Sequence, residues 1–215
     1  MVRWMGVRRM KLPDMEMDIL ETARSPESQS DDAFMRRIAL RETEALHSVA
    51  DLYGDIPFRI GCRMLSDPVE AEDIAQEALL RLWRHADRWK DGGPGIAAWL
   101  SRVGTNLCLD RLRKTRRDSQ EDVPERADET PLADASLESD QMKQAVIDCI
   151  GDLPERQRAS VVLTYYEAMS NQMAADNLEM NIKAFESMLY RARGTLQGCV
   201  EGKGVLAADI ARITP

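Results

Sequence analysis

Apolar residues recur at helical spacing along most of the chain. One stripe has members at positions i, i+4, i+7 and i+11, namely Ile96, Leu100, Val103 and Leu107. This spacing places their side chains on one face of an α-helix. Alternating runs rich in Val, Ile and Thr, which are typical of strands, are missing from the sequence. The pattern predicts an all-α fold.

Three helices are predicted in the first half of the chain. The first spans residues 32–64. The second begins at Asp67, which acts as the N-cap, with a proline in the first turn and Glu70 completing a capping box. It continues to about Trp89. A run of Gly, Pro and polar residues at 90–95 then breaks the pattern before the third helix, which carries the apolar stripe.

An acidic segment separates the two helical regions. Residues 118–140 contain nine acidic residues and one arginine, a net charge of −8, with two prolines and few large apolar residues. Such a segment buries too little apolar surface to offset the entropy lost on ordering. We predict a flexible, extended linker over 118–141.

Short helices follow the linker and end in a two-helix arrangement. Ser170 is predicted to cap a helix over 171–177, a tight turn follows at 178–180, and Asn181 caps a longer helix over 182–199. This is the layout of a helix-turn-helix. The predicted molecule is two small helical domains joined by a flexible acidic linker. Its parts are a weakly ordered N-terminal extension (1–33), a first domain (34–117), the linker (118–141), a helix-turn-helix domain (142–200) and a C-terminal tail (201–215).

The net charge is uneven along the chain. With 29 Lys and Arg against 37 Asp and Glu, the chain carries −8 and has a pI near 5.0, which alone argues against nucleic-acid binding. Residues 34–117 nevertheless carry +3, and residues 143–200 carry only −1. Five cations fall within Arg111–Arg117, more than a helix dipole needs for compensation. We therefore predict a phosphate-binding patch there.

Composition disfavours several other classes of protein. No run approaches the ~18 apolar residues of a membrane span, and the N-terminus lacks a signal-peptide pattern, so we predict a cytoplasmic protein without membrane insertion. Two histidines and four widely separated cysteines disfavour a zinc site or a disulfide framework. The cysteines are predicted to be buried, reduced thiols: Cys62, Cys108, Cys149 and Cys199. No metal site, cofactor site or nucleophile–base pair can be assembled, which disfavours an enzyme.

Four segments together resemble the sigma-70 family of RNA polymerase initiation factors. Residues 71–84 resemble its polymerase-binding helix, and residues 98–113 resemble its promoter-melting helix. Residues 153–158 and 184–193 resemble its DNA-reading C-terminal domain. Two such domains joined directly by a linker resemble the extracytoplasmic function (ECF) group. The resemblance implies a bacterial alternative sigma factor that binds core RNA polymerase, recognises and melts promoter DNA, and has an anti-sigma factor as a partner.

One set of residues is implied to bind core polymerase. Asp73, Gln76 and Glu77 lie within about one and a half helical turns, next to Leu80 and Arg81. They form an acidic, hydrogen-bonding face, which the resemblance assigns to docking on the clamp coiled coil of the large polymerase subunit. Without the surrounding motif, the same residues would read as a solvated acidic face near a helix N-terminus.

A second set is implied to hold the −10 promoter element. The resemblance gives Asn106 the role of holding a flipped base, with the 90–95 loop as the wall of the pocket. Because strand opening needs captured bases and backbone cations, the neighbouring basic residues are candidate phosphate contacts. They are Lys90, Arg102, Arg111, Arg113, Lys114, Arg116 and Arg117. Trp99 is predicted to lie in the core, whereas for Trp89 a core position and a base-stacking position both remain open.

A third set is implied to read the −35 element through the N-terminal half of the second helix of the helix-turn-helix. The base-facing candidates are Asn181, Lys183, Ala184, Glu186 and Ser187, and the phosphate candidates are Arg191 and Arg193. The sequence departs from the family pattern in two places. Glu179 stands in the turn where glycine is usual. Glu186 stands where a cation is common.

Two alternatives accompany this interpretation. An autonomous helix-turn-helix regulator would use the N-terminal helices to bind a ligand or to dimerise, but it would leave the Asp73, Gln76 and Glu77 motif unexplained. The acidic linker is either a spacer or, as the resemblance allows, a mimic of nucleic acid in the RNA-exit path of the polymerase.

Overall fold

The computed structural model describes residues 26–118 and 137–204. Within these two ranges the chain is helical and contains no strand, so the all-α prediction is confirmed. None of the described helices is long and apolar enough to cross a membrane. Residues 119–136 of the predicted acidic linker lie outside the described residues, as do residues 1–25 and 205–215. The last five residues of the predicted linker, 137–141, instead belong to a helix that begins at Leu137.

The N-terminal half begins with three helices, α1 (Pro26–Ala39), α2 (Thr43–Tyr53) and α3 (Asp55–Leu65). The single helix predicted over 32–64 is therefore wrong. The chain breaks at Arg41, which has a φ of +65°, and again at Gly54, where a Cβ would collide with the carbonyl oxygen of Ala50. Apolar periodicity continues across the first break because α1 and α2 pack on one core, which hides this break from a pattern analysis.

Two longer helices complete this half: α4 (Pro68–His85), with the short 3₁₀ turn η1 (Ala86–Arg88) behind it, and α5 (Gly95–Asp118). The predicted N-cap is confirmed, since Asp67 Oδ1 accepts hydrogen bonds from the backbone N–H groups of Val69 (2.8 Å) and Glu70 (3.2 Å). The predicted capping box is wrong. The Glu70 carboxylate instead accepts from Arg111 of α5, because that cation lies within reach across the helix pair.

Two glycines allow the helices of this half to approach closely. A Cβ on Gly61 of α3 would lie 2.9 Å from the Cα of Ala71 in α4. A Cβ on Gly104 of α5 would lie 3.0 Å from the Cβ of Pro57 in α3. Real Cβ atoms essentially never come closer than 3.0 Å, so these positions set how tightly α3 packs between its two partners.

The C-terminal half contains α6 (Leu137–Gly151), α7 (Glu155–Val161), a π-helical turn η2 (Val162–Tyr166), α8 (Asn171–Asn177) and α9 (Ile182–Gly202). Helices α8 and α9 form the predicted helix-turn-helix. Both predicted caps are present, because Ser170 accepts from the N–H of Met173 at 3.2 Å and Asn181 accepts from that of Ala184 at 2.8 Å.

A disulfide between Cys149 of α6 and Cys199 of α9 corrects the prediction of four reduced thiols. The two cysteines are fifty residues apart in sequence, but their Cα atoms lie 5.8 Å apart because α6 and α9 pack side by side. Cys62 and Cys108 are free thiols. Burial raises the pKa of the Cys108 thiol to about 12, so that group remains protonated.

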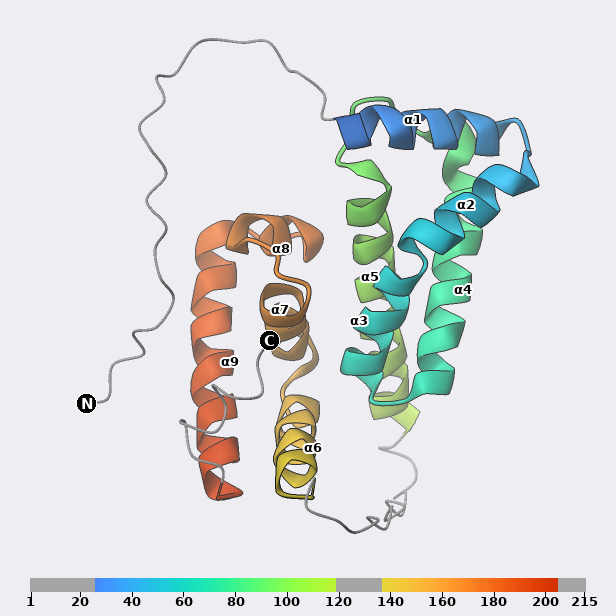
Figure 1. The fold of residues 1–215 in the computed structure, drawn as a ribbon. Coiled ribbons are helices and arrows are strands. Elements are labelled where there is room, and N and C mark those ends of the chain that lie inside the picture. The colour runs from blue at the N-terminus through green and yellow to red at the C-terminus, as the bar shows by residue number, and fades with distance from the viewer. Residues whose placement is uncertain (1–25, 119–136, 205–215) are drawn as a thin grey trace.

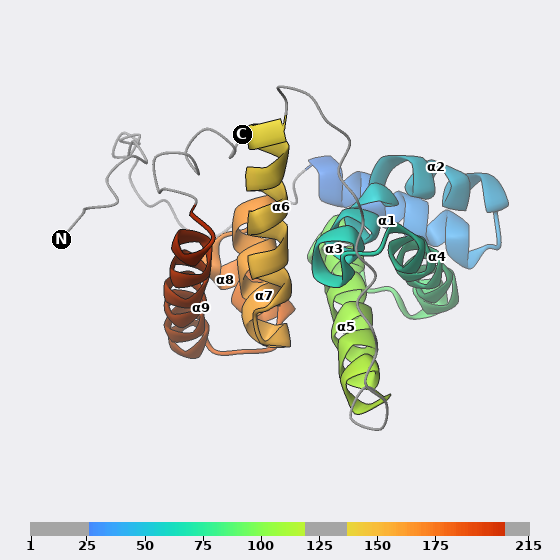
Figure 2. The same cartoon turned by 90° about the horizontal axis from the view of Figure 1, so that it is seen from below.

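The two halves share a hydrophobic core. Met64 and Leu109 of the N-terminal half belong to the same buried cluster as Leu153, Val161 and Phe185 of the C-terminal half. Helices α3 and α5 thus lie against the C-terminal half (Figure 1). In the view from below, α5 projects past this contact, away from the other helices (Figure 2).

Candidate nucleic-acid interface

The outer face of α4 carries the residues predicted to bind polymerase. Asp73, Gln76 and Arg81 are exposed there, and Leu80 is 48% exposed beside them. Glu77 accepts a hydrogen bond from Arg81 at 2.8 Å, and this bond lowers the pKa of the Glu77 carboxyl. The structure brings all five predicted residues onto one face that combines negative charge with an apolar centre.

One face of α5 gathers several of the predicted −10 residues. Arg102, Asn106, Arg113 and Arg117 follow one another at intervals of four, seven and four residues, which places them on the same side of the helix. Asn106 is half-buried on this side. Lys114, the residue after Arg113, is exposed. The face offers one side-chain amide followed by cations toward the C-terminal end of the helix.

Not all of the predicted basic patch faces the same way. Arg111 lies on the α4 side of α5, where it binds Glu70 at 2.8 Å and lies 3.9 Å from Asp73. Arg116 pairs with Glu155 of α7 at 3.3 Å. The sequence cluster is therefore divided among a contact within the N-terminal half, a contact to the C-terminal half and an outer face.

The loop between η1 and α5 places the last predicted −10 cation, Lys90, in an exposed position. Trp99 is partly buried in the N-terminal core and stacks on His85 with ring centroids 5.4 Å apart, in agreement with the predicted core role. Trp89 packs against the same core. Its indole N–H donates to Asp32 of α1 at 2.9 Å, which favours the core alternative for this residue.

The outer face of α9 carries the predicted −35 residues. All of them are exposed: Asn181, Lys183, Ala184, Glu186, Ser187, Arg191 and Arg193. The opposite face buries Phe185, Met188, Leu189 and Ala192 against the C-terminal core. The helix therefore separates into a packing face and a solvent-exposed face.

Tyr190 is a residue of this outer face that the sequence analysis missed. It is 78% exposed and lines a shallow surface hollow with Glu186, Ser187 and Arg191. Its spacing of three and four residues from Ser187 and Glu186 is the signal that would have placed it on the same face.

The turn of the helix-turn-helix holds Glu179 in the left-handed conformation, with a φ of +53°, as expected for a position where glycine is usual. Its carboxylate accepts a hydrogen bond from Arg102 of α5, and this contact lowers its pKa. Arg156 of α7 donates to the carbonyl oxygen of the preceding Leu178 at 2.7 Å. A predicted −10 residue is thus bound to the turn that presents the −35 helix.

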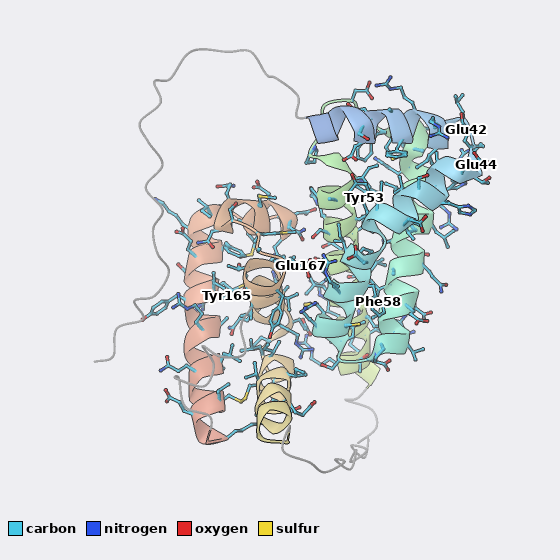
Figure 3. All side chains as sticks on the ribbon, viewed as in Figure 1. Glu42, Glu44, Tyr53, Phe58, Tyr165 and Glu167 are labelled. Carbon is cyan, nitrogen blue, oxygen red and sulfur yellow. A yellow bond between two sulfur atoms is a disulfide. The ribbon has the colours of Figure 1, made fainter. Side chains whose placement is uncertain are left out.

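Further polar contacts join the two halves, and none of them is predictable from spacing along the chain. The Glu167 side chain is 5% exposed and binds Arg59 of α3 at 2.9 Å, with Arg63 3.8 Å away. Figure 3 shows Glu167 pointing from the C-terminal half toward α3. Two more hydrogen bonds cross the boundary: Arg158 donates to the carbonyl oxygen of Met64 at 2.6 Å, and Asn177 donates to Ser101 at 3.0 Å.

Comparisons with known proteins match both halves. The family model described as Sigma-70 region 2 matches residues 50–118, and the model described as Sigma-70, region 4 matches residues 143–196. Similar curated proteins include the ECF RNA polymerase sigma factor SigK of Mycobacterium sp. (strain KMS), 27% identical over 172 residues, which cover 78% of this chain and 87% of SigK. The ECF sigma factor SigW of Bacillus subtilis (strain 168) is 28% identical over 174 residues, which cover 76% of this chain and 92% of SigW.

Solved structures share the fold. CnrH, in complex with the cytosolic domain of CnrY, superposes with a TM-score of 0.59 at 23% identity, over 80% of this chain and 98% of CnrH. The sigma factor RpoE of Bartonella quintana, in complex with the anti-sigma factor NepR, gives 0.58 at 23% identity, over 72% of this chain and 96% of RpoE.

A region 2 followed by a region 4, with the two models together matching more than half of the chain, defines a promoter-recognition subunit of RNA polymerase. The chain belongs to the sigma-70 family of initiation factors. Within the family it falls in the ECF group of alternative sigma factors, and both the predicted family and the predicted function are confirmed.

Proposed function

We propose that three surfaces divide the work of this initiation factor. The outer face of α4 binds core polymerase, the outer face of α5 with the 90–95 loop engages the −10 element, and the outer face of α9 reads the −35 element. The observation that carries the proposal is that the predicted polymerase-binding residues lie together on one face of α4 and the exposed −35 candidates lie together on one face of α9. In this scheme residues 34–117 act as the domain that binds polymerase and melts DNA, and residues 142–200 as the domain that reads the upstream element.

Individual residues take roles that their chemistry supports. The amide of Asn106 donates and accepts hydrogen bonds, so it can hold the edge of a flipped base. Arg102, Arg113 and Arg117 supply cations along the same face for the displaced backbone. Glu186 can accept from a cytosine amino group in the major groove, which is the usual base contact of a carboxylate there.

The proposal extends to the partners and setting of the protein. It acts in the cytoplasm as a component of the polymerase holoenzyme and catalyses no reaction itself. An anti-sigma factor is included as a partner because RpoE, which shares the fold, was solved with NepR.

Run-off transcription tests the function directly. Purified chain and core polymerase are incubated with a DNA library randomised over the −10 and −35 elements. We expect transcripts from a subset of sequences only when both proteins are present. Tight, specific duplex binding by the free chain, without stimulation of transcription, would instead support the autonomous regulator.

A further inference from the structure

Two neighbouring aspartates on α1 are buried. Asp31 is 4% exposed and Asp32 is 2% exposed. A carboxylate is almost never buried to this degree unless its oxygens are hydrogen-bonded, because it would otherwise lose its hydration without replacement. The partners of the two side chains therefore indicate what the burial achieves.

Asp31 binds the start of α5. Its Oδ2 accepts from the backbone N–H of Ile96 at 2.8 Å, and its Oδ1 accepts from the hydroxyl of Tyr53 at 2.8 Å. The first N–H groups of a helix have no partner within the helix, so a carboxylate from another helix takes the place of a local cap. Figure 3 shows Tyr53 at the end of α2, close to α5.

Asp32 binds the other end of the same loop. Its Oδ1 accepts from the indole N–H of Trp89 at 2.9 Å, and its Oδ2 accepts from the backbone N–H of Gly92 at 3.0 Å. All four carboxylate oxygens therefore accept hydrogen bonds. Three of the donors belong to residues 89–96, and the fourth is Tyr53 of α2.

The backbone of the loop is matched to these two acids. Gly92 and Gly95 have φ angles of +78° and +87°, which glycine adopts without strain. A Cβ on Gly95 would lie 2.8 Å from Asp31 Oδ2, so the carboxylate occupies the space that any other residue would need. Sequence and fold together hold the loop in one shape.

We propose that Asp31 and Asp32 are positioning residues for −10 recognition. They fix the 89–96 loop as a preformed pocket wall, so that a promoter base is captured without the cost of ordering the loop at that moment. Neither acid touches DNA. The inference rests on the proposed function, which assigns the loop to the −10 element.

The isosteric variants Asp31→Asn and Asp32→Asn test the proposal. An amide has one accepting oxygen, so in Asp32→Asn the N–H of Trp89 or of Gly92 faces a second donor. In Asp31→Asn the amide oxygen can keep the Ile96 N–H while the Tyr53 hydroxyl turns to accept, so that variant loses the charge on the hydrogen bonds rather than their number. We expect hydrogen exchange of the 89–96 amides to rise by about tenfold in the free chain. With core polymerase and the most active library promoter, we expect discrimination at one −10 base to fall by about tenfold. Discrimination at the −35 element and retention on core polymerase should stay unchanged.

Two further variants keep the result interpretable. Trp89→Phe keeps an aromatic ring in the core and removes only the N–H that Asp32 accepts, so it should reduce the same −10 discrimination by a smaller factor. Arg37→Ala is the matched control on α1, since it removes an exposed ion pair to Glu42 at 2.7 Å, outside the 89–96 loop, and should change neither measurement.

Three outcomes would overturn the proposal. Faster exchange with unchanged −10 discrimination would make the aspartates stabilising residues only. Equal losses at the −10 and −35 elements, with weaker retention on polymerase, would indicate general damage to the fold. Failure of the unaltered chain to open any library promoter would instead reject the proposed function, and the inference with it.

Discussion

Glu179 combines two opposing demands at a single residue. Its left-handed backbone favours glycine, whereas its carboxylate binds Arg102 in the other half of the molecule. The backbone conformation of the turn favours glycine at this position, but glycine could not form the ion pair with Arg102. Replacement of Glu179 therefore separates backbone strain from the ion pair.

Two substitutions at this position should differ in thermal stability. Glu179→Ala removes the ion pair and keeps the strained φ, whereas Glu179→Gly removes both. We expect the glycine variant to melt about 2–4 °C above the alanine variant. Differential scanning calorimetry measures the difference. Equal melting temperatures would show that the turn relaxes around alanine.

Asn106 is the residue with the most specific proposed contact to DNA. Because a paired amide–base contact contributes about 1–3 kcal/mol, Asn106→Ala should slow open-complex formation by about tenfold or more. Permanganate reactivity of the −10 thymines measures the opening. Gln197→Ala, which removes an amide near the end of α9 that binds Glu201, is the control and should open promoters normally.

At the scale of a helix, the outer face of α4 can be tested by charge. Asp73→Lys combined with Glu77→Lys should abolish retention on immobilised core polymerase, because both acids lie on the proposed contact face. The control variant Glu44→Lys with Asp51→Lys makes the same change in net charge at exposed positions of α2. It should still bind the immobilised core polymerase. Loss of retention in both double variants would point to a non-specific charge effect.

Helices α6 and α9 are joined covalently by Cys149 and Cys199. Closing a loop of fifty residues restricts the unfolded chain and, in the chain-entropy model, stabilises the folded state by about 4 kcal/mol. Reduction should therefore lower the free energy of unfolding by about 2–4 kcal/mol. Urea denaturation with and without dithiothreitol measures this change.

Cysteine variants identify the source of the effect. Cys149→Ser should be as unstable as the reduced chain and should not respond to dithiothreitol. Cys62→Ser leaves the disulfide intact and should respond as the unaltered chain does. A response in Cys149→Ser would assign the reductant effect to another part of the molecule.

Local chemistry explains which elements could be predicted. At the caps Asp67, Ser170 and Asn181, the side chain accepts from a backbone N–H two or three residues later. Such local contacts can be predicted from the sequence. The break at Arg41 was not predicted, because no glycine or proline marks it. The disulfide was also missed, since its pairing depends on how α6 packs against α9.

The site was predictable to the same extent. The exposed faces of α4, α5 and α9 follow from helical spacing, which is why the predicted residues of α4 and α9 fall together. Arg111 turns toward Glu70 and Arg116 toward Glu155, because each finds a carboxylate on another element. Residue spacing within one helix does not predict an ion pair with a residue of another helix.

At the scale of the whole molecule, two of the arginines that hold the halves together are also proposed −10 contacts. Arg102 and Arg116 bind acids of the C-terminal half, and Glu167 is buried between Arg59 and Arg63. If Arg102 and Arg116 bind the promoter as proposed, their contacts with Glu179 and Glu155 must first open. In the proposed scheme the packed arrangement competes with DNA for these two cations.

A charge swap across this boundary tests how far the buried ion cluster at Glu167 holds the two halves together. Glu167→Arg places a third cation beside Arg59 and Arg63 and should open the molecule, which increases the radius of gyration in small-angle X-ray scattering. Arg59→Glu added to Glu167→Arg restores an opposite pair and should restore the compact form. An unchanged radius in the single variant would show that the shared hydrophobic core and the remaining polar contacts hold the halves together without Glu167.

The same disulfide has a consequence for the durability of the chain. Everything between Cys149 and Cys199 forms one covalent ring, and this ring contains α7, η2, α8 and most of α9. A single protease cut within it leaves both fragments attached, so the DNA-reading helix stays on the molecule until the cystine is reduced. The nicked chain should migrate as one band in non-reducing electrophoresis and as two bands after reduction.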